Sequence, residues 1–274
     1  MRRRELVTTA LALAATQASA QSTPSTPLAQ SELLVMAAGS LRRAMNEIAA
    51  AFERAMPGQR GKLVFGASGL LLERIQKGER ADVFASANLE HPQALVTAGK
   101  ARGVRPFARN ALCALVAPGV AVQSETLVDR LLDVRIRLGT STPNADPSGD
   151  YAWTMFERIE QQGRTGAFRT LSGKALQLTG GPTSPPPPAD RNVYGVLVAE
   201  GQADIFITYC TNASLALAEQ PRLRVVAVPA AINVSASYGL AVLDGAAAGA
   251  VAFAEFMLAP AAQALLARQG FSAP

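Results

Sequence analysis

Residues 63–75, Leu-Val-Phe-Gly-Ala-Ser-Gly-Leu-Leu-Leu-Glu-Arg-Ile, combine an apolar run, a turn of small residues and an amphipathic segment. Leu71, Leu72 and Ile75 recur at the spacing of one helix face, which predicts a strand followed by a helix. Ser68 lies where this helix begins, beside backbone N–H groups that lack an intrahelical partner. These N–H groups and the helix dipole favour an anion, although a strand-to-helix turn by itself also needs small residues.

A second copy of this pattern occurs upstream, in residues 33–41, Leu-Leu-Val-Met-Ala-Ala-Gly-Ser-Leu. It again predicts a strand, a turn of small residues with a serine, Ser40, and a helix. Successive strands of a parallel sheet end at one edge, where ligands bind. We therefore expect Ser40 and Ser68 to face one cleft with the geometry of an anion site.

Strand and helix patterns alternate along the rest of the chain. Apolar strands are predicted at 81–87, 110–117 and 204–210, and a long polar turn at 139–149 leads into another helix. This alternation predicts an α/β protein with parallel-type sheets flanked by helices. The proline-rich loop 179–190 is interpreted as an extended, exposed spacer.

The first twenty residues have the three parts of a secretory signal peptide. Arginines 2–4 form the basic start, residues 6–15 the apolar core, and Ala18-Ser19-Ala20 the cleavage site. The apolar run is too short to span a bilayer, and the arginines leave Sec and twin-arginine export both open. We expect residues 1–20 to be removed, residues 21–30 to form a flexible polar tether, and the mature chain to be soluble and periplasmic.

The composition is that of an ordinary globular protein, with 49% of the 274 residues hydrophobic and 17% charged. The leader contributes three arginines and one glutamate, so its removal lowers the formal net charge from +5 to +3. This mild charge argues against nucleic acid as a partner. No later stretch predicts a transmembrane helix, so we expect no membrane insertion of the mature chain, which we expect to be a monomer.

The sequence offers little support for catalysis. Ser68 does not form a nucleophile elbow, because Leu70 replaces the second glycine of G-x-S-x-G. The chain has one histidine, His91, which is interpreted as a surface turn residue, so a Ser-His-Asp triad is not expected. The chain has no zinc-type cluster and no phosphate-binding loop, and we expect no metal centre, cofactor or catalytic residue.

Five short segments carry a further signal through their order in the chain: residues 37–41 (Ala-Ala-Gly-Ser-Leu), 66–69 (Gly-Ala-Ser-Gly), 81–87 (Ala-Asp-Val-Phe-Ala-Ser-Ala), 146–152 (Asp-Pro-Ser-Gly-Asp-Tyr-Ala) and 201–209 (Gly-Gln-Ala-Asp-Ile-Phe-Ile-Thr-Tyr). In this order they resemble the periplasmic molybdate-binding proteins that supply ABC importers. The resemblance covers nearly all of residues 31–274. Each segment is too short to be specific by itself, and it is their shared order that makes the resemblance specific.

The resemblance implies a two-lobed periplasmic binding protein fold of type II, with the ligand in the cleft between the lobes. The first lobe would comprise residues 31–109 and 212–274, and the second lobe residues 110–211. The two strands that cross between the lobes would lie near residues 108–114 and 209–213.

The resemblance also implies that neutral hydrogen-bond donors hold a tetrahedral oxyanion. Ser40 and Ser68 would each supply a hydroxyl and a backbone N–H group. Ser148 would supply its backbone N–H, because the family usually has alanine at this position. Val193 would supply another backbone N–H, and Tyr209 would close on the anion with its hydroxyl.

The ligand implied by the resemblance is molybdate or tungstate, one ion per chain, delivered to the permease of an ABC importer. A fully deprotonated dianion only accepts hydrogen bonds, which suits a site of N–H and O–H donors. Asp150, close to Ser148, is unfavourable beside a dianion, and the segment from Val193 to Tyr209 is slightly shorter than in the family. Another oxyanion such as sulfate or phosphate, a small organic acid, and an enzyme on a similar two-lobed fold stay open as alternatives.

The two cysteines, Cys113 and Cys210, would lie on the two crossing strands of such a fold. An exported location permits a disulfide, and a count of two is what a single bridge requires. Two separate buried thiols that pack as small hydrophobic groups are the alternative. Strand register decides between them, because the Cα atoms must approach within about 7 Å.

Overall fold

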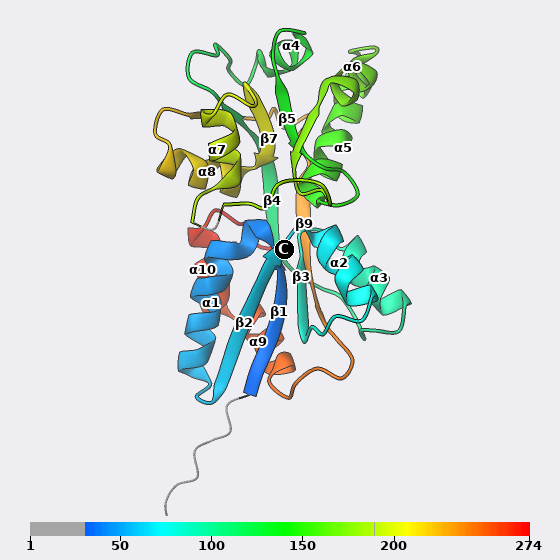
Figure 1. Cartoon of the computed structure of the whole chain (residues 1–274), viewed down its shortest axis with the longest axis vertical. Helices are drawn as coiled ribbons and strands as arrows, with labels where there is room; N and C mark the ends of the chain where they lie inside the picture. Colours follow the sequence, from blue (N-terminus) through cyan, green and yellow to red (C-terminus); the bar gives the residue numbers. More distant parts are fainter. Residues whose placement is uncertain (1–30, 189) are drawn as a thin grey trace, which may run out of the picture.

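The computed structural model describes residues 31–188 and 190–274, and the expected signal peptide and tether lie outside these residues. Two α/β lobes lie one above the other along the long axis of the molecule (Figure 1). The strand order across both is β2-β1-β3-β9-β4-β7-β5-β6, and β8 also pairs with β4. The predicted fold class, a type II binding-protein fold of two lobes with flanking helices, is therefore present.

The sheet of the first lobe has a parallel part and an antiparallel part. Strand β1 pairs in parallel with β2 and β3, and β3 pairs antiparallel with β9. The strands of this lobe are β1 (Ser31–Ala38), β2 (Gln59–Gly66), β3 (Val83–Ser86) and β9 (Ser235–Val242). The helices are the short 3-10 helix η1 (Gly39–Leu41), α1 (Arg42–Ala55), α2 (Ser68–Gln76), α3 (Glu90–Thr97), α9 (Ala250–Leu258) and α10 (Pro260–Arg268).

The second lobe repeats this plan. Strand β5 pairs in parallel with β6 and β7. Its strands are β5 (Leu138–Ser141), β6 (Leu176–Thr179), β7 (Ile205–Tyr209) and β8 (Arg224–Ala227). Its helices are α4 (Leu127–Leu132), α5 (Pro147–Gln161), α6 (Ala167–Lys174), α7 (Val193–Ala199) and α8 (Cys210–Glu219).

Strand β4 (Arg105–Val116) belongs to both lobes, because its first half pairs with β9 and its second half with β7 and β8. Residues 210–213 begin helix α8 and do not form the second crossing strand. Because β8 also pairs with β4, the chain returns to the first lobe only between Ala227 and Ser235. We therefore propose a lobe division in which residues 212–234 lie with the second lobe, later than the expected boundary.

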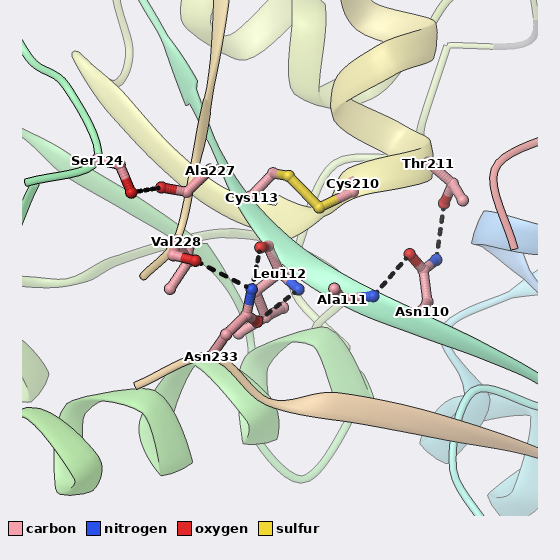
Figure 2. Close-up of a disulfide and its surroundings, with 10 residues drawn as sticks. All are labelled: Asn110, Ala111, Leu112, Cys113, Ser124, Cys210, Thr211, Ala227, Val228 and Asn233. Atoms are coloured by element: carbon pink, nitrogen blue, oxygen red, sulfur yellow. Dashed lines mark hydrogen bonds between the residues drawn. A yellow bond between two sulfur atoms is a disulfide. The ribbon is translucent and has the colours of Figure 1, made fainter. Parts of the chain in front are cut away.

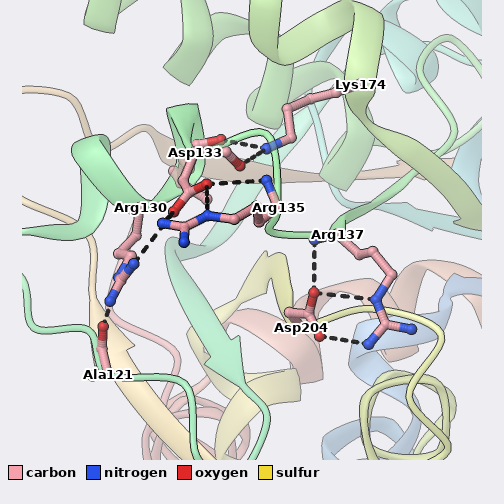
Figure 3. Close-up of polar contacts among 8 residues, drawn as sticks. Ala121, Arg130, Asp133, Arg135, Arg137, Lys174 and Asp204 are labelled. Atoms are coloured by element: carbon pink, nitrogen blue, oxygen red, sulfur yellow. Dashed lines mark hydrogen bonds and ion pairs between the residues drawn. The ribbon is translucent and has the colours of Figure 1, made fainter.

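An aspartate holds the start of a central strand in each lobe. Asp82, fully buried just before β3, accepts a hydrogen bond from the Leu34 N–H at 2.7 Å. Asp204, just before β7, accepts one from the Arg137 N–H at 2.8 Å, and both of its oxygens also pair with the Arg137 guanidinium (Figure 3). The aspartates of the two Ala-Asp-x-Phe segments therefore have the same structural role, because each accepts a hydrogen bond from the backbone of a neighbouring segment.

The amphipathic pattern of α1 buries one helix face against the first lobe. Met45, Ile48 and Phe52 are fully buried, and the Phe52 ring packs edge-on against Phe253 of α9 with centroids 5.1 Å apart. Burial of such a side chain contributes about 1.5–3 kcal/mol. Among the described residues, no single helix has the length and hydropathy to cross a membrane, and α9 and α10 reach that threshold only as a pair bent by 63°.

Candidate functional site

A cavity of about 630 Å³ lies between the lobes. The first lobe lines it with Ser40 and Ser68, the serines of the two repeated strand-to-helix turns. The second lobe lines it with Val193 and Tyr209, and also with the carboxylate residue Asp146. The structure thus brings four of the five expected ligand-binding residues to one cavity.

Ser68 is the first residue of α2, and its side chain is buried. Its Oγ accepts a hydrogen bond from the Ala87 N–H at 3.1 Å. A backbone N–H can only donate, so the proton of the Ser68 hydroxyl remains free for another acceptor. Ser68 is therefore held as a hydrogen-bond donor at the wall of the cavity.

Tyr209 ends β7 and is 1% exposed. Within the described part of the chain its hydroxyl has no hydrogen-bond partner, and its ring packs against Tyr151 and Tyr238 at centroid distances of 6.3 and 5.7 Å. Burial raises the pKa of the Tyr209 hydroxyl well above its usual value. The hydroxyl therefore keeps its proton at neutral pH and can donate it to a ligand.

Val193 is the first residue of α7, as the expected role requires. The Asn192 side chain caps this helix by accepting a hydrogen bond from the Gly195 N–H at 3.0 Å. The N–H groups of Val193 and Tyr194, in the first turn, have no intrahelical partner. Both residues line the cavity, so their N–H groups are placed at the positive end of the helix dipole beside it.

Ser148 departs from the expected arrangement. Its N–H donates to Asp146 Oδ1 at 3.1 Å, so the expected backbone donor already has a partner. Ser148 is fully buried and does not line the cavity. Asp146, the N-cap of α5, stands at the helix end where the anion was expected.

Asp146 is the site residue that sequence reasoning missed. Burial raises the pKa of its carboxyl to about 6, against the opposing effect of the hydrogen bond from the Ser148 N–H. Gly180 approaches it so closely that a Cβ there would lie 2.6 Å from Asp146 Oδ2. The signal in the sequence was the Asp-Pro pair, because aspartate favours the N-cap and proline the first helical position.

Asp150 does not line the cavity. Its Oδ1 accepts a hydrogen bond from the Asn144 N–H at 2.7 Å, which holds Asn144 at a positive φ of 66°. His91, which was interpreted as a surface residue, is instead half-buried at the start of α3. Burial lowers the pKa of its imidazole, and the charge of Asp150 opposes this shift.

The proline-rich segment is more than a spacer. Prolines 185–188 line the cavity, and the segment between β6 and α7 runs across the molecule at the level where the lobes meet (Figure 1). Arg42 and Arg43 of α1 line the cavity from the first lobe, and the Arg42 guanidinium lies 4.5 Å from the centroid of the Phe65 ring. The outer part of the cavity therefore has a stiff apolar wall and cationic side chains.

Cys113 of β4 and Cys210 of α8 form a disulfide, with an S–S distance of 2.05 Å and Cα atoms 4.8 Å apart (Figure 2). Cys210 directly follows Tyr209, and Tyr209 pairs with Leu112 of β4. The bond therefore attaches the backbone next to Tyr209 to the strand that both lobes share.

Residues 33–272 match the family described as bacterial extracellular solute-binding protein. An uncharacterised protein of Pasteurella multocida is 36% identical over 211 residues, which are 76% of this chain and 85% of that protein. The molybdate-binding protein ModA of Mycobacterium tuberculosis is 27% identical over 245 residues, 88% of this chain and 85% of ModA.

The same fold occurs in a solved structure, the sulfate-binding protein SubI of Mycobacterium tuberculosis. The TM-score is 0.73 at 20% identity, and the match covers 88% of this chain and 86% of SubI. The match to this structure shows the fold. The family model covers residues 33–272, which are most of the chain, and describes a solute-binding protein. The protein belongs to the family of bacterial extracellular solute-binding proteins.

Proposed function

We propose that this protein captures one molybdate or tungstate ion per chain in the periplasm and delivers it to the permease of an ABC importer. The carrying observation is that residues with hydroxyl groups, and residues in the first turn of α7 whose N–H groups lack an intrahelical partner, line one cavity. Ser40, Ser68 and Tyr209 supply the hydroxyls, and Val193 and Tyr194 supply the N–H groups at the start of α7. In this account the mature chain acts as a monomer without a cofactor.

The chemistry of the donors suits a dianion without protons. Each hydrogen bond to a charged group contributes about 1.5–3 kcal/mol. Four or five such bonds, less the cost of ordering the ligand and closing the lobes, account for affinities of about 1 µM or tighter. The sequence relative that binds molybdate supports this ion class, since the resemblance to ModA extends over most of both chains.

Isothermal titration of the ligand-stripped mature protein tests the proposal. We expect saturable binding of molybdate and tungstate at one ion per chain, and much weaker binding of sulfate, whose smaller radius leaves the donors too far apart. Ser68→Ala should weaken the binding of both large ions. Binding of an amino acid or a sugar, with flat titrations for every oxyanion, would contradict the proposal.

Asp146 favours a second candidate, an oxyanion that carries a proton, such as hydrogen phosphate. A protonated oxyanion has an O–H donor, and a carboxylate in the cavity is an acceptor for it. Asp146, Asp190 and Glu219 line the cavity and Asp150 does not. Asp190 and Glu219 are exposed, so Asp146 is the carboxylate best placed to accept a hydrogen bond from this proton. Phosphate is therefore titrated beside molybdate with both the wild-type protein and Asp146→Asn.

An enzymatic role receives less support from the cavity. A hydrolase or transferase would need a base or a nucleophile with a suitable pKa in the cleft. No histidine is among the described residues that line the cavity, and none of the cavity serines Ser40, Ser68 and Ser184 is hydrogen-bonded to a basic side chain. The family match also describes a solute-binding function.

A further inference from the structure

A chain of hydrogen bonds connects Ser40 to the opposite lobe. Ser40 Oγ lies 2.9 Å from the hydroxyl of Tyr238, which lies 3.4 Å from Asn110 Nδ2, and that nitrogen lies 2.8 Å from Thr211 Oγ1. We propose that Asn110 and Tyr238 are positioning residues that turn the proton of the Ser40 hydroxyl toward the bound oxyanion. This inference rests on the proposed function, because it concerns how the same site binds its ligand.

The assignment of donors and acceptors along this hydrogen-bond chain starts from the side-chain amide of Asn110. The Ala111 N–H donates to Asn110 Oδ1 at 3.0 Å (Figure 2). Because a backbone N–H can only donate, this contact assigns the oxygen of the side-chain amide. The Nδ2 group must then face Thr211 and Tyr238, and it can only donate to their hydroxyls.

Tyr238 is the next residue in this hydrogen-bond chain, between Asn110 and Ser40. Its hydroxyl accepts from Asn110 and lies 2.9 Å from Ser40 Oγ, and in our proposal it donates its own proton to Ser40. The Tyr238 ring is fully buried and packs edge-on against Phe107 and Phe271, so its hydroxyl has little freedom to point elsewhere.

Ser40 then has one remaining direction for its proton. With Tyr238 as the donor of this pair, Ser40 Oγ accepts, and Ser40 lines the cavity. Ser68 shows the same arrangement by a different route, because its Oγ accepts from the Ala87 N–H. In this arrangement Ser40 and Ser68, the cavity serines of the first lobe, are both donors, which favours a ligand that only accepts hydrogen bonds.

The four residues of this hydrogen-bond chain come from both lobes. Thr211 belongs to α8 of the second lobe, Asn110 to β4, Tyr238 to β9, and Ser40 to η1 of the first lobe. The orienting hydrogen bonds therefore pass through both long strands at the junction of the lobes. Asn110 is 4% exposed, so water does not compete strongly for its amide.

A double-mutant cycle measured by titration with molybdate tests the inference. Tyr238→Phe keeps the ring and removes the hydroxyl, and we expect it to weaken binding about tenfold in the wild-type background, within the range known for contacting residues. In the Ser40→Ala background the same change should alter affinity by less than about twofold, because its target is gone. Tyr151→Phe is the matched control. Tyr151 packs against Tyr209 but is not part of the hydrogen-bond chain that ends at Ser40.

The outcomes separate a positioning role from a structural one. Equal losses from Tyr238→Phe in both backgrounds would overturn the inference while leaving the proposed function intact. Failure of the wild-type protein to bind any oxyanion would overturn both. Asn110→Ala, measured in the same two backgrounds, tests the next residue of the chain if Tyr238→Phe does not fold, and equal losses there would also overturn the inference.

Discussion

The backbone N–H of Gly69 donates to the carbonyl oxygen of Ala145 at 2.8 Å, and this hydrogen bond joins the two lobes beside the cavity. Gly69 lies in the first turn of α2, and Ala145 in the loop before α5. A Cβ at residue 69 would lie 2.6 Å from the carbonyl oxygens of both Asn144 and Ala145. The lobes can therefore approach this closely only because residue 69 has no side chain.

Gly69→Ala should weaken ligand binding by tenfold or more, because the added methyl group collides with two backbone oxygens when the lobes close. The same change should leave unchanged or raise the melting temperature of the ligand-free protein, because alanine stabilises a helix by up to about 1 kcal/mol relative to glycine. Titration and thermal unfolding of the same samples measure both effects. Gly103→Ala, where a Cβ has no neighbour within 4 Å, is the control and should change neither.

The three serines should differ in their contribution to binding. Ser40→Ala and Ser68→Ala should each cost about 1–3 kcal/mol of binding free energy, because each leaves an oxygen of the anion without a partner. Ser148→Ala should cost much less, because the Ser148 N–H is bonded to Asp146 and Ser148 is not among the residues that line the cavity. A larger loss from Ser148→Ala than from the other two would show that the α5 helix end is misassigned.

Asp146 makes binding of a dianion depend on pH. Its pKa is raised to about 6, so the carboxyl is neutral below that pH and becomes negative as the pH rises through it. Affinity for molybdate should therefore fall as the pH increases from about 5.5 to 8. Asp146→Asn keeps an N-cap residue and should remove this pH dependence, with tighter binding at pH 8.

The same variant separates the two candidate ligands. If the ligand is hydrogen phosphate, the amide oxygen of Asp146→Asn keeps the hydrogen bond from the Ser148 N–H, and an NH2 donor replaces the oxygen that would accept the phosphate proton. The substitution should then weaken phosphate binding instead. Titrations of wild-type protein and Asp146→Asn with both ions at one pH give opposite signs for the two candidates. Equal affinities of the two proteins for both ions would mean that Asp146 does not contact the ligand.

The disulfide closes a long loop, since Cys113 and Cys210 are 97 residues apart. In the chain-entropy treatment such a crosslink stabilises the folded state by about 4–5 kcal/mol. Urea unfolding with and without reductant should show a loss of this order, and the Cys113→Ser/Cys210→Ser double variant should match the reduced protein. Alkylation of the denatured, unreduced protein should label no cysteine, and two labelled cysteines would rule the bridge out.

The ion pair at the far end of the second lobe gives a pH-dependent contribution to stability. Hydrogen bonds from Arg137 lower the pKa of Asp204 below its value in the unfolded chain. This stabilisation is therefore present above the unfolded pKa and is lost as the pH falls through the lower folded value. Asp204→Asn should lower the free energy of unfolding at pH 7 by about 1–3 kcal/mol and have a smaller effect near pH 3, as measured by denaturant titration.

The sequence alone predicted the parts of the protein that depend on local pattern. The repeated strand-serine-helix turns gave the α/β fold and brought Ser40 and Ser68 to one cavity, because parallel strands end at the same sheet edge. The lobe division that we propose places the return of the chain later than the sequence-based boundary, since α8 follows β7 directly and β8 pairs with β4. An apolar strand looks the same in sequence whichever lobe it joins.

The parts of the site that the sequence did not predict depend on contacts between residues that lie far apart in the sequence. Tyr238 and Asn110 lie 198 and 70 residues from Ser40 and carry no motif that points to it, so only the fold reveals their contact. Prolines 185–188 have the composition of a spacer, and their place at the cavity follows from where β6 and α7 end. Asp146 precedes a proline, as an N-cap residue often does, but this local pattern does not reveal its position at the cavity.

A crystal structure of the mature protein grown with molybdate, with anomalous diffraction recorded at the molybdenum absorption edge, tests the central claim most directly. The account predicts one strong molybdenum peak per chain, with oxygens of the ion within hydrogen-bond distance of the Ser40, Ser68 and Tyr209 hydroxyls and of the N–H groups at the start of α7. A peak only at the outer surface, or a cavity that holds an organic molecule and no molybdenum, would contradict it.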